Sequence, residues 1–137
     1  MHTLDGKGRL TVPARYRDVL MAAVGGEMFV TKNPDGCLSL FPRPVWESFR
    51  ARLNALPEAR NRLKRLYIGH AVEVQIDGAS RVLIPPELRE WAGLEREVIF
   101  MGMGNRFELW DKARYAAHEA ATLDQGLGDQ LDDLFVE

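Results

Sequence analysis

Two stretches of the chain carry the same pattern, "LDGKGRLTVPARYR" at residues 4–17 and "IDGASRVLIPPELR" at residues 76–89. They align without gaps, with residue 4 matching residue 76 and residue 17 matching residue 89. Self-similarity at a fixed offset usually means that one structural unit is used twice. The matched pairs are Asp5 with Asp77, Gly6 with Gly78, Arg9 with Arg81, Pro13 with Pro85 and Arg17 with Arg89. The pattern therefore predicts two tandem copies of one unit.

The second copy shows how the unit is built. Apolar and polar residues alternate from Val72 to Ile76, which is typical of a half-buried strand. The Asp–Gly pair should reverse the chain, because Asp can bond the following backbone and Gly accepts a positive φ. Residues 81–84 are expected to form the next strand, which Pro85 ends as it begins a helix. Each copy is thus predicted as strand, tight loop, strand and short helix.

The two copies differ in their loops and in what precedes them. Only residues 1–4 stand before Asp5, so the leading strand of the first copy should be the shorter one. Ser80 stands where the first copy has Gly8, which should restrict the backbone of the second loop.

Apolar residues at helical spacing predict a helix after each loop, two helices between the copies and one at the end. The markers after the loops are Tyr16, Val19 and Leu20, and Leu88, Trp91 and Ala92. Between the copies, Val45, Trp46, Phe49 and Leu53 mark one helix, and Leu63, Leu66, Tyr67 and His70 mark another that starts near Pro57. The last helix should run from Asp111, a suitable N-cap, to about Thr122. Two hairpins complete the halves, "EMFVTK" with "CLSLF" and "EVIFM" with "RFELW".

Composition limits the class of protein. At 137 residues with 46% hydrophobic side chains, the chain can form one compact body with a buried core. No stretch reaches the roughly 20 apolar residues that cross a bilayer, so we expect a cytosolic protein without a membrane partner. Cys37 has no disulfide partner and should be a small packed side chain. The three histidines show no metal-ligand spacing, and we expect neither a metal nor a cofactor.

Charge is unevenly distributed along the chain. The formal net charge is −2, yet residues 118–137 contain six carboxylates and no Lys or Arg. Those six are Glu119, Asp124, Asp129, Asp132, Asp133 and Glu137. The remaining chain is therefore basic, which suits a polyanion such as nucleic acid, although a solvated helix face is the commoner cause of a basic run.

An enzymatic function is not supported. Two Asp–Gly motifs in a repeat are similar to the paired carboxylates of aspartic proteases, which share a proton. Those enzymes need a hydroxyl residue before the glycine, whereas Gly6 and Gly78 follow the aspartates directly. An arginine four residues after each Asp would also keep the carboxylate ionised. We therefore predict a protein that is not an enzyme.

The strings "DGKGRLTVPARYR", "DGASRVLIPPELR", "RLYIGHAVEVQIDG" and "RFELWD" resemble the MraZ family of bacterial transcriptional regulators, and the resemblance covers essentially the whole chain. It implies a mainly β fold with helices (α+β), built from two fused swapped-hairpin barrel halves of the AbrB type. It also implies a ring-shaped homo-oligomer, typically octameric. The implied partner is double-stranded DNA, at short direct repeats in the promoter of the division and cell-wall gene cluster, and the implied location is the cytoplasm and nucleoid.

The resemblance also divides the chain into three parts. Residues 1–70 would be the first AbrB-like repeat with the connecting helices, and residues 71–123 the second repeat with the C-terminal helix. Residues 124–137 would be an acidic tail with a few apolar side chains. This tail keeps an alternative function open, an AbrB-like antitoxin or another protein-binding module.

Basic side chains around a paired-strand unit are candidates for contacts with a DNA groove and its phosphates. The predicted DNA contacts are Lys7, Arg9, Arg15, Arg17, Arg81 and Arg89, and the predicted structural motif is Asp5, Gly6, Pro13, Asp77, Gly78 and Pro85. The first copy is expected to be the main DNA face, because Lys7 and Arg15 are replaced in the second copy by Ala79 and Glu87. Alternatively, each Asp could form an ion pair with the arginine four residues on and close its own loop.

Overall fold

The computed structural model describes residues 2–126 and 134, and it is a mixed α+β fold with the predicted order of elements. The first copy contains β1 (His2–Thr3), β2 (Arg9–Thr11), α1 (Ala14–Val24), β3 (Glu27–Lys32) and β4 (Leu38–Pro42). The connection contains α2 (Arg43–Asn54), the 3₁₀ turn η1 (Glu58–Arg60) and α3 (Asn61–Tyr67). The second copy contains β5 (Val72–Gln75), β6 (Arg81–Leu83), α4 (Pro86–Trp91), β7 (Glu97–Gly102), β8 (Phe107–Asp111) and α5 (Lys112–Gln125). The leading strand of the first copy is the shorter one, as predicted.

The two copies exchange strands. Six strands form one sheet in the order β1-β7-β8-β4-β3-β5, in which β1 pairs with a strand of the second copy and β5 with a strand of the first. The hairpins β3–β4 and β7–β8 meet at the centre of this sheet, where Ser39 lies opposite Glu108. The exchange agrees with the swapped hairpins that the family resemblance implies.

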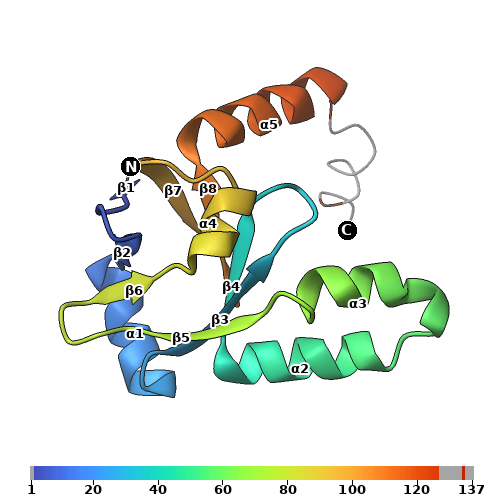
Figure 1. Ribbon diagram of the computed structural model, residues 1–137, viewed down its shortest axis with the longest axis horizontal. Helices are drawn as coiled ribbons and strands as arrows, with labels where there is room; N and C mark the ends of the chain where they lie inside the picture. Colours follow the sequence, from blue (N-terminus) through green and yellow to red (C-terminus); the bar gives the residue numbers. More distant parts are fainter. Residues whose placement is uncertain (1, 127–133, 135–137) are drawn as a thin grey trace.

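The two remaining strands, β2 and β6, pair with each other in a separate antiparallel ribbon, and a single bridge joins Leu10 of β2 to Leu4. Leu10 lies opposite Val82, its counterpart in the repeat, so the approximate twofold relation between the copies passes through this pair. Figure 1 shows the ribbon beside α1 at the left of the view, whereas α2 and α3 extend to the right. The two strands of one Asp–Gly unit are therefore not hydrogen-bonded to each other along their length.

The core lies between the ribbon, the sheet and the helices that follow the loops. Leu10, Val82 and Ile84 are fully buried. Phe100 and Phe107 stack with ring centroids 4.9 Å apart, and Tyr16 meets Phe107 edge-on at 5.0 Å. Offset and edge-on aromatic pairs of this kind add to the free energy gained by burial alone. Both copies thus contribute to one shared core.

Proline and glycine define the helix ends that position the basic residues. Pro13 and Pro85 occupy the N-cap positions of α1 and α4, where a missing N–H leaves no hydrogen bond unmade. Gly25 ends α1 in the left-handed conformation, and its N–H donates to the carbonyl of Met21. The side chain of Asp111 accepts from the N–H of Arg114, which confirms the predicted cap of α5.

Of three further expectations, one needs correction, one is confirmed and one remains a prediction. The second connecting helix begins with a 3₁₀ turn and ends at Tyr67, so His70 is exposed and not packed in a helix stripe. Cys37 is fully buried as predicted, and this burial raises the pKa of its thiol. The predicted boundaries near residues 70 and 123 stay a prediction, and most of the acidic tail lies outside the described residues. Within residues 2–126 and 134, no helix is long and apolar enough to cross a membrane.

Candidate nucleic-acid interface

The first loop is closed by the carboxylate of Asp5. Its Oδ1 accepts from the backbone N–H groups of Lys7 and Arg9, both at 2.9 Å. Its Oδ2 lies 2.6 Å from Nε of Arg9, which forms the ion pair that the sequence left as an alternative. The backbone closes the same loop, because the N–H of Gly8 donates to the carbonyl of Asp5 at 3.0 Å. One acidic side chain thus fixes both the loop and the arginine at the start of β2.

The second loop repeats this geometry. Oδ1 of Asp77 accepts from the N–H groups of Ala79 at 2.8 Å and Arg81 at 2.9 Å, and Oδ2 lies 3.2 Å from Nε of Arg81. The backbone N–H of Arg9 is the main cause that lowers the pKa of Asp5 to about 2, and the N–H of Arg81 likewise lowers the pKa of Asp77. Both carboxylates are therefore ionised at neutral pH, and each is committed to its own loop.

In each loop, the residue with a positive φ is not the glycine after the Asp, which the sequence indicated. Gly6 and Gly78 do not have a positive φ, and a Cβ on either would meet no atom within 4 Å. The left-handed residues are Gly8, at φ 85°, and its counterpart Ser80, at φ 65°. The restriction expected at Ser80 is therefore real, because an L-residue rarely adopts this conformation. Gly6 and Gly78 leave the outer side of each loop without a side chain.

The ribbon directs alternate residues to its outer face. Leu10 and Val82 point into the core, so Arg9, Thr11, Arg81 and Leu83 share the opposite face. Each arginine uses Nε for its aspartate. The terminal nitrogens of both guanidinium groups make no hydrogen bond within the described residues, and both side chains are about one-third exposed, 28% for Arg9 and 33% for Arg81. The face thus presents two guanidinium groups that are fixed in position and whose terminal nitrogens have no hydrogen-bond partner among the described residues.

The strand exchange places the other basic residues at both ends of the ribbon. The N–H of Ile84 donates to the carbonyl of Gly8, and the N–H of Val12 donates to the carbonyl of Ser80. Each loop therefore lies beside the residues that lead into the helix of the other copy. Lys7 shares one end with Arg89 of α4, whereas Arg15 and Arg17 of α1 lie at the other end. The basic residues of the first copy do not form one continuous cluster.

Arg17 and Arg89 match in the repeat but differ in their contacts. Nε of Arg89 donates to the carbonyl of Ile84 at 2.9 Å, and its guanidinium lies so close to Gly8 that a Cβ there would be 2.4 Å from Cζ. The residue that matches Gly8 in the repeat is Ser80, which has a Cβ. Arg17 instead places Nη1 3.2 Å from Asp18, and its buried Nε has no hydrogen-bond partner in the described part of the chain.

Among the predicted DNA contacts, Arg15 and Lys7 make the fewest contacts with other described residues. Arg15 is exposed, with its guanidinium 4.6 Å from the centre of the Tyr16 ring. The side chain of Lys7 is exposed and makes no hydrogen bond or ion pair within residues 2–126 and 134. The predicted DNA contacts thus all lie on or beside the ribbon, and their contact with DNA stays a prediction.

Sequence reasoning did not select Thr11 and Leu83, although both share the outer face with the arginines. Leu83 is an apolar side chain that is 53% exposed. The alternation of strand residues predicts that Arg9 and Thr11 share the face opposite Leu10 and Val12, and the same alternation places Leu83 opposite Val82 in the second copy. No group of three or more His, Cys, Asp or Glu side chains within the described residues could hold a metal.

A two-stranded ribbon fits the major groove of B-DNA, which is about 12 Å wide. Arginine is suited to the bases of this groove and to phosphates, because its planar fork can donate two hydrogen bonds at once. The geometry therefore supports recognition of a duplex by groups held in fixed positions.

The pKa of Asp5 provides a direct test of how the loop is closed. NMR titration of its carboxyl carbon should give a pKa of about 2. Because a backbone N–H is the main cause, Arg9→Ala should leave most of this lowering in place, and Lys7→Ala should change it little. A folded pKa below the unfolded value of about 3.9 means that the carboxylate stabilises the fold above that pH. This contribution is lost as the pH falls through about 2. A pKa that returned to the ordinary range in Arg9→Ala would show instead that the guanidinium closes the loop.

Exchanging the residues at the two left-handed positions should have opposite effects. Gly8→Ser should lower the free energy of unfolding by about 2 kcal/mol, because the new Cβ displaces Arg89 and adds backbone strain. Ser80→Gly relieves strain of about 1 kcal/mol but makes the unfolded chain more flexible, so a net gain of ~0.5 kcal/mol is expected. Urea denaturation measures both changes. Equal effects of the two substitutions would contradict the asymmetry between the loops.

Comparison with known proteins matches both halves of the chain to one family. The family model described as "MraZ protein, putative antitoxin-like" matches residues 1–66 and again residues 67–135. Three relatives carry the name Transcriptional regulator MraZ, which describes a regulator and agrees with the prediction that the protein is not an enzyme. They come from Acidovorax sp. (strain JS42), with 53% identity over 96% of this chain and 92% of the relative, from Methylibium petroleiphilum, with 55% over 95% and 89%, and from Burkholderia multivorans, with 54% over 94% and 91%. Since the match includes both Asp–Arg loops and the strands that they join, the chain belongs to the MraZ family.

Proposed function

We propose that the protein is a transcriptional regulator that binds double-stranded DNA with the outer face of the β2–β6 ribbon. The observation that carries this proposal is the pair of guanidinium groups of Arg9 and Arg81. Each is anchored through Nε, and its terminal nitrogens make no hydrogen bond within the described residues. Fixed orientation matters, because an anchored arginine loses less conformational freedom on binding than a free one. The names of the relatives support the regulatory role.

The loops at the two ends of the ribbon would meet the phosphates. Gly6 and Gly78 donate none of the hydrogen bonds that close their loops, and neither carries a side chain that would keep DNA away. A backbone can therefore approach a phosphate closely at these points. Lys7 adds a positive charge at one end, and Arg15 and Arg17 add charge at the other.

The family resemblance supports a more specific target, short direct repeats in the promoter of the division and cell-wall gene cluster. It also supports assembly into an octameric ring in the cytoplasm, at the nucleoid. A ring repeats one surface by rotation, so DNA that follows its rim meets each ribbon in the same orientation. Repeated sites in one direction are the sequence that such a surface would read. Val19 and Met21 of α1 are exposed apolar side chains available for contacts between copies.

A second candidate function is an antitoxin or other protein-binding module. It is favoured by the words "antitoxin-like" in the description of the family. The sequence feature behind it, the acidic tail, lies mostly outside the described residues.

Salt dependence tests the proposed DNA contacts. Affinity for the promoter upstream of the gene should fall steeply with salt, with a slope of about 0.9 for each phosphate contacted. Lys7→Ala should weaken binding and reduce this slope by roughly one contact, because this side chain has no structural role. Lys112→Ala, which removes an exposed lysine on α5 that pairs with Glu97, is the matched control and should leave the slope unchanged. Fluorescence anisotropy at several salt concentrations measures all three. Equal affinity for the promoter and for a random duplex would contradict the proposal.

A second pair of variants separates the role of Arg9 in DNA binding from its role in closing the loop with Asp5. Arg9→Ala should weaken promoter binding by about tenfold or more, because a good arginine contact to a base is worth roughly 1–3 kcal/mol. Asp5→Asn keeps an oxygen that can accept the backbone bonds but removes the charge that attracts the guanidinium. It should therefore weaken DNA binding less than Arg9→Ala does, because the guanidinium remains but its orientation is no longer fixed. If both variants lost affinity equally, Arg9 would act only by closing its loop.

A further inference from the structure

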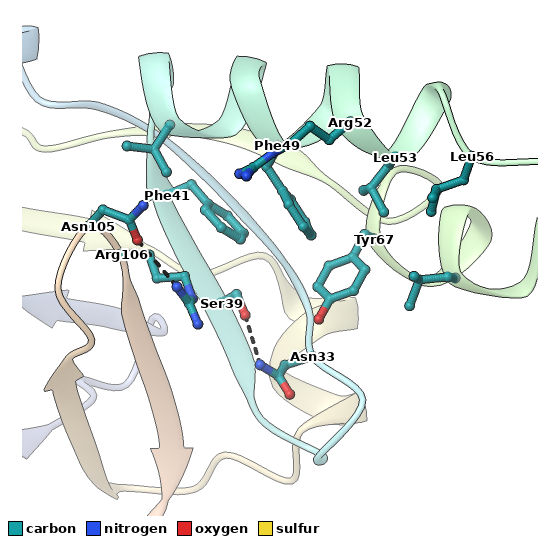
Figure 2. A pocket seen from close by; sticks show the side chains of 12 residues that line it. Asn33, Ser39, Phe41, Phe49, Arg52, Leu53, Leu56, Tyr67, Asn105 and Arg106 are labelled. Carbon is teal, nitrogen blue, oxygen red and sulfur yellow. Dashed lines mark hydrogen bonds between the residues drawn. The ribbon is translucent and has the colours of Figure 1, made fainter. Parts of the chain in front are cut away.

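A groove of about 420 Å³, which we call the arm groove, lies between α2, α3, β4 and the turn that joins β7 to β8, away from the ribbon. Its apolar walls come from Phe41, Val45, Phe49, Leu53, Leu56 and Leu63. Figure 2 shows Asn105 and Arg106 at one end of this arm groove and Leu53 and Leu56 at the other. The proposed DNA contact uses none of these residues, so the arm groove needs an explanation of its own.

The arm groove is positively charged. Arg52 and Arg106 both line it, and neither has a carboxylate within 4.0 Å among residues 2–126 and 134. Arg106 lies near the hydroxyl of Tyr67, whose pKa is raised by burial, lowered in part by this guanidinium and raised by the carboxylates of Asp35 and Glu108, which do not line the groove. The neighbouring segment from residue 58 to 65 adds four basic side chains against a single acid, Glu58. An apolar floor between unpaired arginines fits a partner that is both apolar and acidic.

The chain contains such a partner at its own C-terminus. Residues 127–137 read "LGDQLDDLFVE" and carry four carboxylates without a basic residue. Leu127, Leu131, Leu134 and Phe135 recur at the spacing of one helix face. Leu134, the one residue of this segment that the structure describes, is 79% exposed, so its side chain is available to another surface. Sequence and groove are thus complementary in both charge and hydrophobicity.

We propose that residues 127–137 dock in the arm groove as an amphipathic segment. The leucines and Phe135 would cover Phe49, Leu53 and Leu56, and the aspartates would pair with Arg52 and Arg106. Helices that lay an apolar face in a groove are a common mode of peptide recognition. The occupant is this segment of the same chain.

Covalent attachment makes a weak contact sufficient. A segment joined directly to α5 is present at an effective concentration in the millimolar range. Partly exposed ion pairs contribute only about 0–1 kcal/mol each, so most of the free energy must come from the apolar side chains. The charges would then select the orientation of the segment and exclude other apolar segments.

Photo-crosslinking of the full chain tests the location. Phe135 is replaced by benzoyl-phenylalanine, and the cross-linked peptides are identified by mass spectrometry. We expect cross-links to residues 49–67 or 105–106 within one chain. Cross-links confined to other regions, such as the β2–β6 ribbon, or formed only between copies would overturn the proposal. An absence of cross-links would overturn it as well.

Charge reversal tests the recognition. Arg52→Glu with Arg106→Glu should lower the cross-link yield by roughly tenfold, since two partly exposed ion pairs become repulsive. Arg96→Glu, an exposed arginine outside the groove, is the matched control. Asp132→Lys with Asp133→Lys should lower the yield equally while every groove residue stays unchanged. Combining the two double variants should restore the cross-links, and a failure of this rescue would contradict pairing between these charges.

Discussion

The pairing of β2 with β6 is the constraint on which the rest of this structure depends. The partner strand of each belongs to the other copy, and within its own copy β2 makes a single bridge to Leu4. The register places Leu10 opposite Val82, and both side chains are fully buried. A slip by one residue would move the two side chains to solvent and bring Arg9 and Arg81 into the core. The register of β2 and β6 therefore fixes both the hydrophobic core and the exposed face of the ribbon.

Because the strands are exchanged, neither copy is complete by itself. Without the second copy, β2 would have no partner strand, and β3 would lose β5 from its edge. Unpaired strand edges are exposed to association with other chains, so a half of this protein should aggregate or pair with a second half. The sequence contains two copies of one motif, whereas the strands of both copies form one shared sheet and core. The predicted boundary near residue 70 would therefore divide the sequence but not the core.

Much of the fold could be predicted from the sequence, because its signals are local. Alternation, proline positions and the Asp111 cap identified the strands and helices, and the matched loops identified the repeat. Local signals failed where tertiary contacts decide. Val19 has the spacing of a core residue but is 64% exposed, because the described part of the chain places no element over that side of α1. The pattern "DG" indicated a glycine turn at residues 6 and 78, whereas the network of bonds to each Asp moves the left-handed residue two positions further on. The division of the basic residues between the two ends of the ribbon needed knowledge of the strand exchange, which no single segment encodes.

The approximate symmetry of the two ends makes their differences informative. At one end, the guanidinium of Arg89 lies against Gly8, and its Nε donates to the carbonyl of Ile84, so this arginine joins α4 to the residue after β6. At the other end, the repeat has Ser80 in the position of Gly8, and Arg17 lies 3.2 Å from Asp18 with its Nε buried and without a hydrogen-bond partner among the described residues. A buried donor without a partner is unfavourable, so Arg17 stabilises its end of the ribbon less than Arg89 stabilises the other. Two copies of one motif therefore give a nearly symmetric ribbon whose two ends are held by different contacts.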